Sequence, residues 1–341
     1  MLKRKVVFLL LTFMIITVFW AATGCSKQGK GPAGLNLAVE YNTHAACAYV
    51  AQSEGWLEER GCEPEAFEVY ATGVALAAAL TKDSIDAAYI CLVPAITAYA
   101  NAEVPIKIVC GTHKYGYALV VNPAKINTVR DLEKEMKIGC VKEGGATDLL
   151  LHKIIAYYGL DRQKVLGYVL RMDPAKQIMA LAAGQLDAVV VPEHFASIAE
   201  QKLGFRMLVK SQDVWPQMQG SVLIVTDKLL QEDPGKVKDL LEITSLATDY
   251  INESPSLAAE ILAEKLNAFP VDLQELAGDG SHDFAVTPEL VASSMANLEY
   301  TTRVEQAEIQ EVIDFMQQLG YIKEHFSAAD ILLEQSYFRS E

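Results

Sequence analysis

The sequence has few basic residues for its length. It contains 29 Lys and Arg residues against 44 Asp and Glu residues in 341, which gives a net charge of −15. DNA and RNA are polyanions, so an acidic chain without a basic patch repels them. The composition therefore excludes nucleic acid as a partner and suits an exported, soluble domain.

Cysteine pairs with metal-ligand or redox spacing are also missing. The six cysteines include no C-x-x-C pair, the spacing typical of zinc and thiol–disulfide sites. Cys91, Cys110 and Cys140 lie in or beside apolar runs, where cysteine acts as a small hydrophobic residue. We therefore expect no metal and no cofactor, and we do not expect Cys47 to pair with Cys62 in a disulfide.

Known catalytic signatures are absent as well. The sequence contains neither the H-E-x-x-H zinc motif nor the G-x-S-x-G nucleophile elbow. His44 and Cys47 lie three residues apart near a predicted helix start and could form a nucleophile pair, but no orienting partner is evident. The sequence favours a binding protein over an enzyme, with no catalytic residues.

One long apolar run stands at the start of the chain. Lys3, Arg4 and Lys5 precede residues 6–23, which carry no charge, and the small residues that follow end in Cys25. This pattern is typical of a secretory signal. Its end resembles the bacterial lipobox, which implies lipidation of Cys25. The alternative is an uncleaved membrane helix, because a run of this length nearly spans a bilayer.

Glycines that follow the apolar run imitate nucleotide-binding motifs. Gly29, Gly31 and Gly34 match G-x-G-x-x-G, but they precede a predicted strand, so no helix N-terminus faces a phosphate. A phosphate-loop match also fails, because Gly31 stands where Ser or Thr would bind magnesium. We interpret residues 1–24 as a lipoprotein signal peptide and residues 25–34 as a lipidated, flexible tether.

The rest of the chain alternates between strand and helix patterns. Strands are predicted at residues 35–40, 65–70, 85–91, 106–111 and 117–122, and again at 136–141, 166–171, 187–192, 205–210 and 221–226. Helices are predicted between them at 44–61, 74–80, 94–100, 148–158, 175–183 and 195–203, and after them at 236–253, 256–266, 288–303 and 305–323. Such alternation predicts parallel sheets with helices on both faces.

The strand–helix series occurs twice and predicts two lobes. We place residues 35–121 and 222–341 in lobe I and residues 122–221 in lobe II. Two chain crossings, near residues 121–123 and 221–225, would join the lobes. The predicted fold class is α/β, with two doubly wound sheets and a helical C-terminal tail.

Seven segments carry a resemblance to a known family. They include "AQSEGWLEERGCEPE", "VNPAKINTVRDLEKEMKIGC", "GGATDLLLHKIIAYYGLD" and "MALAAGQLDAVVVPE", and they follow the family's order and spacing. The chain resembles solute-binding proteins of ABC importers, in the nitrate/sulfonate/taurine-binding family. This resemblance implies the type II periplasmic-binding-protein fold and capture of a small anionic or zwitterionic solute between the lobes. It also implies two partners, a membrane permease and its cytoplasmic ATPase.

The resemblance also implies where the solute binds. In open α/β sheets, ligands bind outside the carboxyl ends of the strands, where helix N-termini favour anions. The predicted ligand-binding residues are Tyr41, Asn42, His44, Thr72, Gly73, Cys91, His113, Tyr115, Gly144, Gly145, Thr147, Glu193, His194 and Trp215. Of these, Glu193 would bind the amine of a zwitterion such as taurine.

Other functions fit the same sequence. The lobes could report a ligand to a membrane sensor kinase, bind a pyrimidine of the thiamine-precursor type, or form an interaction protein with a degenerate cleft. Our interpretation is an exported monomer without metal or cofactor. Lipid on Cys25 would hold it at the outer face of the cytoplasmic membrane or in the periplasm.

Overall fold

The computed structural model describes residues 34–268, 284–334 and 337. By internal contacts the chain divides into Met1–Gly34 and Leu35–Glu341, and every helix and strand named below belongs to the second unit. The predicted signal peptide, Cys25 and the tether up to residue 33 lie outside the described residues. Among the helices that the structure describes, none combines the length and apolar character needed to cross a membrane.

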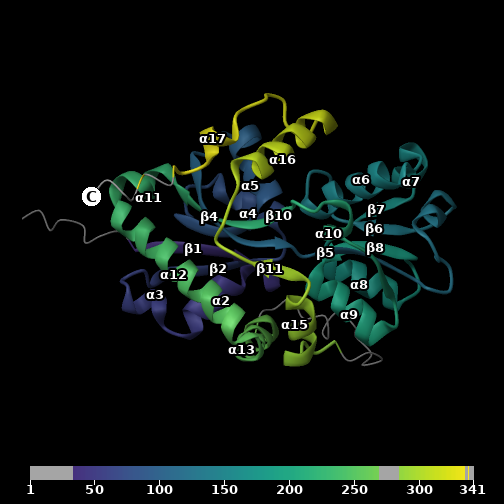
Figure 1. The fold of residues 1–341 in the computed structure, drawn as a ribbon, viewed down its shortest axis with the longest axis horizontal. Coiled ribbons are helices and arrows are strands. Elements are labelled where there is room, and N and C mark those ends of the chain that lie inside the picture. The colour runs from purple at the N-terminus through teal and green to yellow at the C-terminus, as the bar shows by residue number, and fades with distance from the viewer. Residues whose placement is uncertain (1–33, 269–283, 335–336, 338–341) are drawn as a thin grey trace, which may run out of the picture. The chain divides into compact units, whose positions relative to one another are not determined.

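The first sheet has six strands in the order β11-β4-β10-β3-β1-β2 (Figure 1). They are β1 Leu35–Glu40, β2 Pro64–Tyr70, β3 Ala87–Cys91, β4 Ile106–Tyr115, β10 Gln219–Thr226 and β11 Leu298–Tyr300. β1 pairs in parallel with β2 and with β3, and the register places Val39 opposite Tyr89. The last residues of β1 and β3, Glu40 and Cys91, therefore reach the same edge of the sheet.

The second sheet has five strands in the order β7-β6-β8-β5-β9. They are β5 Tyr117–Val121, β6 Ile138–Cys140, β7 Val169–Arg171, β8 Ala188–Pro192 and β9 Arg206–Lys210. β6 pairs in parallel with β7 and β8. We call the parts of the chain built on the first and second sheets the first and second lobes.

Helices cover both faces of each sheet (Figure 1). The helices before β5 are η1 Thr43–Ala45, α2 Ala46–Ser53, α3 Trp56–Glu59, α4 Gly73–Leu80 and α5 Leu92–Ala102. Those between β5 and β10 are η2 Val129–Glu133, α6 Ala146–Tyr158, α7 Arg162–Gly167, α8 Pro174–Ala182, α9 Glu193–Leu203 and α10 Ser211–Val214. Those after β10 are α11 Asp227–Glu232, α12 Pro234–Glu253, α13 Pro255–Asn267, α15 Pro288–Met295, α16 Gln306–Leu319 and α17 Ala328–Ile331.

The apolar core follows the alternation of side chains along the strands. In β1, Leu37 belongs to the core that contains α2, α12 and α13, whereas Ala38 belongs to the core that contains α4 and α5. In β8, Val189 joins the core of α8 and α9, and Val190 joins that of α6. Strands buried on both faces read as continuous apolar runs, which is why they are visible in the sequence.

Both sheets are mixed, whereas the sequence pattern predicts parallel sheets. β10 runs antiparallel to β3 and β4, and β5 runs antiparallel to β8 and β9. Ser221, near the start of β10, lies opposite Cys91 at the end of β3, and Tyr117 at the start of β5 lies opposite Pro192 at the end of β8. Both strands start at the edge where the others end, so they run in the opposite direction.

The strand at residues 117–121, which the sequence analysis placed in lobe I, hydrogen-bonds within the second sheet. The chain passes to the second lobe at Gly116 and returns through residues 215–218, ahead of the predicted crossings in each case. Tyr115 and Gly116 have φ values of 65° and 91°, which end the extended run of β4. The apolar sequence of residues 117–121 is compatible with either sheet, so it does not predict this change.

Three predicted elements differ locally. The single helix expected at 44–61 is η1, α2 and α3, because Gly55 with φ 79° interrupts it. The helix expected at 288–303 ends at Met295, and β11 then pairs with β4. Residues 162–167 form α7 ahead of a short β7, where a longer strand was expected.

Candidate functional site

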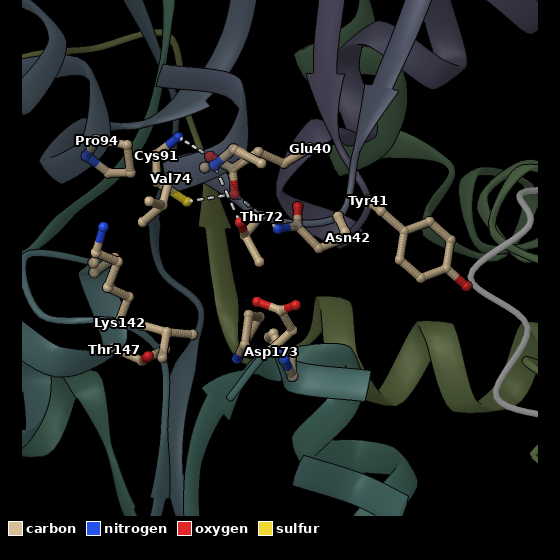
Figure 2. A pocket seen from close by; sticks show the side chains of 18 of the residues that line it. Glu40, Tyr41, Asn42, Thr72, Val74, Cys91, Pro94, Lys142, Thr147 and Asp173 are labelled. Atoms are coloured by element: carbon tan, nitrogen blue, oxygen red, sulfur yellow. Dashed lines mark hydrogen bonds between the residues drawn. The ribbon is translucent and has the colours of Figure 1, made fainter. Parts of the chain in front are cut away.

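A cavity of about 320 Å³ lies between the two lobes, at the carboxyl ends of their strands (Figure 2). Its first-lobe wall consists of Glu40, Tyr41, Asn42, Ala71, Thr72, Gly73, Val74, Ala75, Ala78, Cys91 and Pro94. Its second-lobe wall consists of Tyr117, Val141, Lys142, Gly145, Ala146, Thr147, Asp173, Pro174, Pro192 and Phe195. Most of these side chains are apolar, and three carry a formal charge.

Glu40 is the buried charged group of the first-lobe wall. Its Oε1 accepts a hydrogen bond from the backbone N–H of Cys91 at 2.6 Å, and the backbone N–H of Gly73 also interacts with the carboxyl. Its Oε2 accepts from Asn42 Nδ2 at 3.2 Å and from the Cys91 thiol at 3.1 Å. A carboxylate offers about four lone-pair sites, so these donors saturate it.

The approach of Glu40 depends on Gly73. A Cβ at position 73 would lie 2.4 Å from Glu40 Oε1 and 2.7 Å from Pro94 Cγ. Gly73 is also the first residue of α4, whose N-cap Thr72 accepts a hydrogen bond from the backbone N–H of Ala75 at 3.2 Å. The start of α4 is therefore capped by Thr72 and held against Glu40.

Burial sets the protonation of the groups below the cavity. It raises the pKa of the Glu40 carboxyl, against which the hydrogen bonds from Cys91, Asn42 and Gly73 act. Burial also raises the pKa of the Cys91 thiol well above its usual value. Tyr117 donates its hydroxyl hydrogen to Cys91 Sγ at 2.8 Å. Cys91 is thus a neutral thiol held between Tyr117 and Glu40, not a nucleophile.

The second-lobe wall is built on the start of α6. The N-cap Gly145 donates its backbone N–H to the Lys142 carbonyl at 3.1 Å, which closes a tight turn. Behind it, buried Asp148 accepts from the Gly144 N–H at 3.2 Å and pairs with Arg171 Nη1 at 2.5 Å. Lys142 and Asp173 are exposed at the cavity, and the Asp173 side chain makes no capping hydrogen bond with α8.

Half of the predicted site residues line this cavity. They are Tyr41, Asn42, Thr72, Gly73, Cys91, Gly145 and Thr147. The ring of Tyr41 points away from the centre of the cavity in Figure 2, and its hydroxyl donates to the Leu266 carbonyl at 2.8 Å. Tyr41 therefore lines the cavity without offering its hydroxyl to a solute. Direct contact between these residues and a solute stays a prediction.

Three predicted histidines lie behind the wall. His44 Nε2 is 2.7 Å from the Gly116 carbonyl, and its ring lies 4.4 Å from that of His113. Burial lowers the pKa of His44 to about 4 and that of His194 to about 3. The His194 ring packs edge-on against Tyr41, with 5.8 Å between the ring centroids. All three are neutral packing groups outside the cavity lining at neutral pH.

The other four predicted residues also lie outside the lining. Tyr115 is at the first crossing, and its hydroxyl donates to the Pro216 carbonyl at 2.8 Å in the second crossing. Trp215 is buried, with Lys153 Nζ 4.3 Å from its ring centroid. Gly144 has φ 80° and lies in the turn before α6. Glu193 is buried and accepts from Asn297 Nδ2 at 2.6 Å, and burial raises its pKa to about 7.

The sequence analysis missed the charged residues of the lining, which are Glu40, Lys142 and Asp173. Glu40 ends an apolar strand, and Asp173 stands before the proline that begins α8. Both positions are at the ends of predicted strands, so the rule that located Thr72 and Gly145 applies to them as well. The acidic residue Glu40 at the end of an otherwise largely apolar strand could have indicated a site residue.

Within residues 34–268, 284–334 and 337, no group of three or more His, Cys, Asp or Glu side chains could hold a metal ion. Cys47 and Cys62 are both free and buried, so the disulfide that the sequence analysis did not expect is not formed.

The model of the NMT1-like family matches residues 28–266. The structure is similar to the alkanesulfonate-binding protein SsuA from Xanthomonas axonopodis pv. citri bound to MOPS, at 18% identity and a TM-score of 0.72, covering 89% of this chain and 99% of that one. No curated protein matches the sequence.

Two further solved structures are similar. The periplasmic aliphatic sulphonate binding protein SsuA from Escherichia coli is 20% identical with a TM-score of 0.69, over 90% of this chain and 100% of that one. The periplasmic nitrate-binding protein NrtA from Synechocystis PCC 6803 is 14% identical with a TM-score of 0.71, over 90% and 87%. These likenesses confirm the predicted two-lobed α/β fold of periplasmic binding proteins.

Proposed function

The chain belongs to the NMT1-like family, and from this premise we propose that it is the extracytoplasmic solute-binding protein of an ABC importer. It captures a small solute between its lobes and delivers it to a membrane permease. The names of the structural neighbours, which bind sulfonate and nitrate, support this class of function. The observation that carries the proposal is a cavity of about 320 Å³ lined from both lobes.

Solute capture follows from the shared lining. A solute that contacts both walls binds the closed arrangement of the lobes more tightly than an open one, so it shifts the population toward closure. The closed form is then the one that a permease recognises. The buried, mostly apolar lining also removes water from the polar groups that face the solute.

The two crossings supply a hinge for this motion. Tyr115 and Gly116 form one crossing, and both have positive φ. The Tyr115 hydroxyl donates to the Pro216 carbonyl, and the Tyr115 N–H donates to the Met218 carbonyl at 3.2 Å. Since these bonds tie the crossings together, they act as one hinge rather than two independent linkers.

Membrane attachment is the second part of the proposal. Cys25 carries the lipid, and the glycine-rich residues up to 34 are the tether to the compact unit that begins at Leu35. The support is the charge and apolar pattern ahead of Cys25. The variant Cys25→Ser should abolish lipid labelling in cells and leave an uncleaved precursor. Normal cleavage and membrane retention of this variant would contradict lipidation.

Solute binding is tested by thermal stabilisation of residues 26–341, which include the whole unit from Leu35. The screen contains sulfonates, nitrate, taurine, amino acids, amines and heterocycles. A solute at 100 times its dissociation constant adds about 2.7 kcal/mol to the free energy of unfolding, which gives a clear rise in melting temperature. Absence of stabilisation by every class, with no co-purified small molecule in native mass spectra, would contradict the proposal.

A further inference from the structure

We propose that the solute is an organic cation, an amine or amidine on a compact apolar body, because Glu40 already occupies the anion-binding position of the first lobe. This inference rests on the proposed solute-binding function and names the chemistry of its ligand. It also departs from the oxyanion that strand-end helix N-termini suggest in the sequence.

The first step concerns the helix N-termini of the first lobe. Free N–H groups at such positions are the usual anion sites of α/β proteins. Here the N-cap of α5, Cys91, donates its backbone N–H to Glu40 Oε1, and the backbone N–H of Gly73, the first residue of α4, also interacts with the Glu40 carboxyl. An internal carboxylate therefore takes the place that an oxyanion of the solute would take.

The second step concerns the remaining helix starts near the cavity. Asn42 Oδ1 accepts the His44 N–H at 3.0 Å at the start of η1. Asp148 accepts the Gly144 N–H in the turn before α6, and Glu193 is itself the first residue of α9. One amide and two acids thus stand at or just before these starts, although α6, α8 and α9 themselves have no side-chain cap.

The third step is the charge of the lining. Two carboxylates, Glu40 and Asp173, face one ammonium, Lys142, and Figure 2 shows Glu40 and Asp173 on opposite sides of the pocket. Burial opposes ionisation of Glu40, whose exposed fraction is 4%, whereas its hydrogen-bond donors favour the carboxylate. The field of this carboxylate is weakly screened inside the cavity. An added oxyanion is repelled by this field, whereas a cation is attracted.

The fourth step assigns the contacts. Both carboxyl oxygens of Glu40 accept hydrogen bonds from other residues of the protein. Glu40 therefore acts on the solute mainly through its charge. Asp173 is the direct partner, because its carboxyl makes no capping bond and lies at the cavity. The apolar body of the solute packs on Val74, Pro94 and Phe195. This division explains a cavity that is mostly apolar but acidic.

The experiment uses probe pairs that share one carbon skeleton. Calorimetric titration compares benzamidine with benzenesulfonate, and propylamine with propanesulfonate, on the purified protein. The cationic member of each pair should bind roughly ten-fold or more tightly, the discrimination expected of one charge-assisted hydrogen bond. Tighter binding of the sulfonates would overturn the cation and leave solute binding intact. Failure of both series, together with a blank solute screen, would count against both proposals.

Two variants separate the roles of the acids. Glu40→Ala leaves the N–H groups of Gly73 and Cys91 without their acceptor, so benzenesulfonate should bind roughly ten-fold more tightly than to the unaltered protein. A gain of this kind cannot come from misfolding. Asp173→Asn, at the exposed rim, should weaken benzamidine several-fold without a gain for benzenesulfonate.

The control is Glu63→Gln, an exposed acid that does not line the cavity. It should leave both affinities unchanged, which separates a local effect from a change in net charge. If Glu40→Ala gains no sulfonate affinity, or if Glu63→Gln shifts the preference as much as Asp173→Asn does, the assignment of the cation site is wrong.

Discussion

The two walls of the cavity are built differently. In the first-lobe wall, Glu40 and the backbone N–H groups of Gly73 and Cys91 are buried and bonded to one another. In the second-lobe wall, Lys142 and Asp173 are exposed, and the turn at Gly145 holds by a bond to a neighbouring carbonyl. The first wall is assembled before a solute arrives, and the second is free to adjust to it.

The first wall sets selectivity, and the second wall adapts during closure. A buried, saturated carboxylate cannot rearrange without leaving donors unsatisfied, so the first wall fixes the sign of charge that the cavity accepts. Exposed side chains on the second wall keep their rotamer freedom until closure, so they adapt to the size of the solute. Six substitutions, with Tyr99→Phe as a control, test this contrast.

The largest effect is expected from Gly73→Ala. The added methyl would meet Glu40 Oε1 at 2.4 Å and Pro94 Cγ at 2.7 Å in a wall that has no room to shift. We expect a loss of about 2–3 kcal/mol in the free energy of unfolding, measured by urea denaturation, together with loss of solute binding.

The matched substitution in the other wall is Gly145→Ala. Its Cβ would lie 2.6 Å from Val141 Cγ2, which can rotate away, and 3.2 Å from the Lys142 carbonyl oxygen. Gly145→Ala should lower the free energy of unfolding by about half as much as Gly73→Ala does. Equal losses at the two glycines would remove the distinction between a rigid wall and an adaptable one.

The next effect depends on pH and concerns Glu193. Burial raises the pKa of Glu193 from 4.5 to about 7, so the folded protein holds a proton that the unfolded chain has released. This group therefore stabilises the fold less as pH rises from 4.5 through 7. Glu193→Gln keeps an oxygen for Asn297 and should gain on the order of 2 kcal/mol relative to wild type above pH 7.

Denaturation curves of both proteins at pH 5 and pH 8 measure this gain, since the difference between them cancels the other titrating groups. Burial lowers the pKa of His44 and His194, and their contribution falls in acid and is common to both proteins. A gain of equal size at pH 5 and pH 8 would show that the carboxyl is not the titrating group.

A smaller effect is expected for Tyr321→Phe. Tyr321 follows α16, and its hydroxyl donates to Asp148 Oδ2 at 2.5 Å behind the second wall. Its removal should cost about 1–2 kcal/mol, because the acceptor is a buried carboxylate. The control Tyr99→Phe removes a long contact of 3.5 Å to the Asp330 carbonyl and should be nearly neutral in the same urea titration. Similar losses for both would argue that Asp148 does not depend on Tyr321.

The smallest contrast is between two threonines on opposite walls. Thr72 caps α4 through its hydroxyl, whereas Thr147 Oγ1 is 3.8 Å from Cys140 Sγ, a weak contact. Replacement by valine preserves the shape of each side chain. Thr72→Val should cost about 1 kcal/mol by thermal denaturation, and Thr147→Val should cost a few tenths. The reverse order would mean that the second wall is the better organised one.

Much of the fold was predictable from the sequence because its central strands are buried on both faces. The runs at β3 and β8 are apolar throughout, and β1 is apolar apart from Asn36 and Glu40. The direction of β5 and β10 was not predictable, because it depends on where the chain crosses between lobes. One crossing is fixed by positive φ angles at Tyr115 and Gly116. The alternation of apolar residues along the sequence does not predict these angles.

The site was predictable in position and less so in direction. The strand-end rule located Thr72, Gly73 and Gly145, because backbone at a strand end must lie at the sheet edge. It could not decide which way His113 or His194 points, since that depends on the packing of the histidines against the crossing and against Tyr41. Nor could it show that Glu40 meets Cys91, which only the pairing of β1 with β3 brings together.

The buried cysteines have a practical consequence. Cys47, Cys62, Cys91, Cys110 and Cys140 are all free and buried in the part of the chain described, so a thiol reagent must wait for each region to open. The rate of alkylation at each cysteine therefore reports how often the surrounding region opens. Bound solute should lower the alkylation rate of Cys91, beneath the cavity, more than that of Cys62, beside the start of α12.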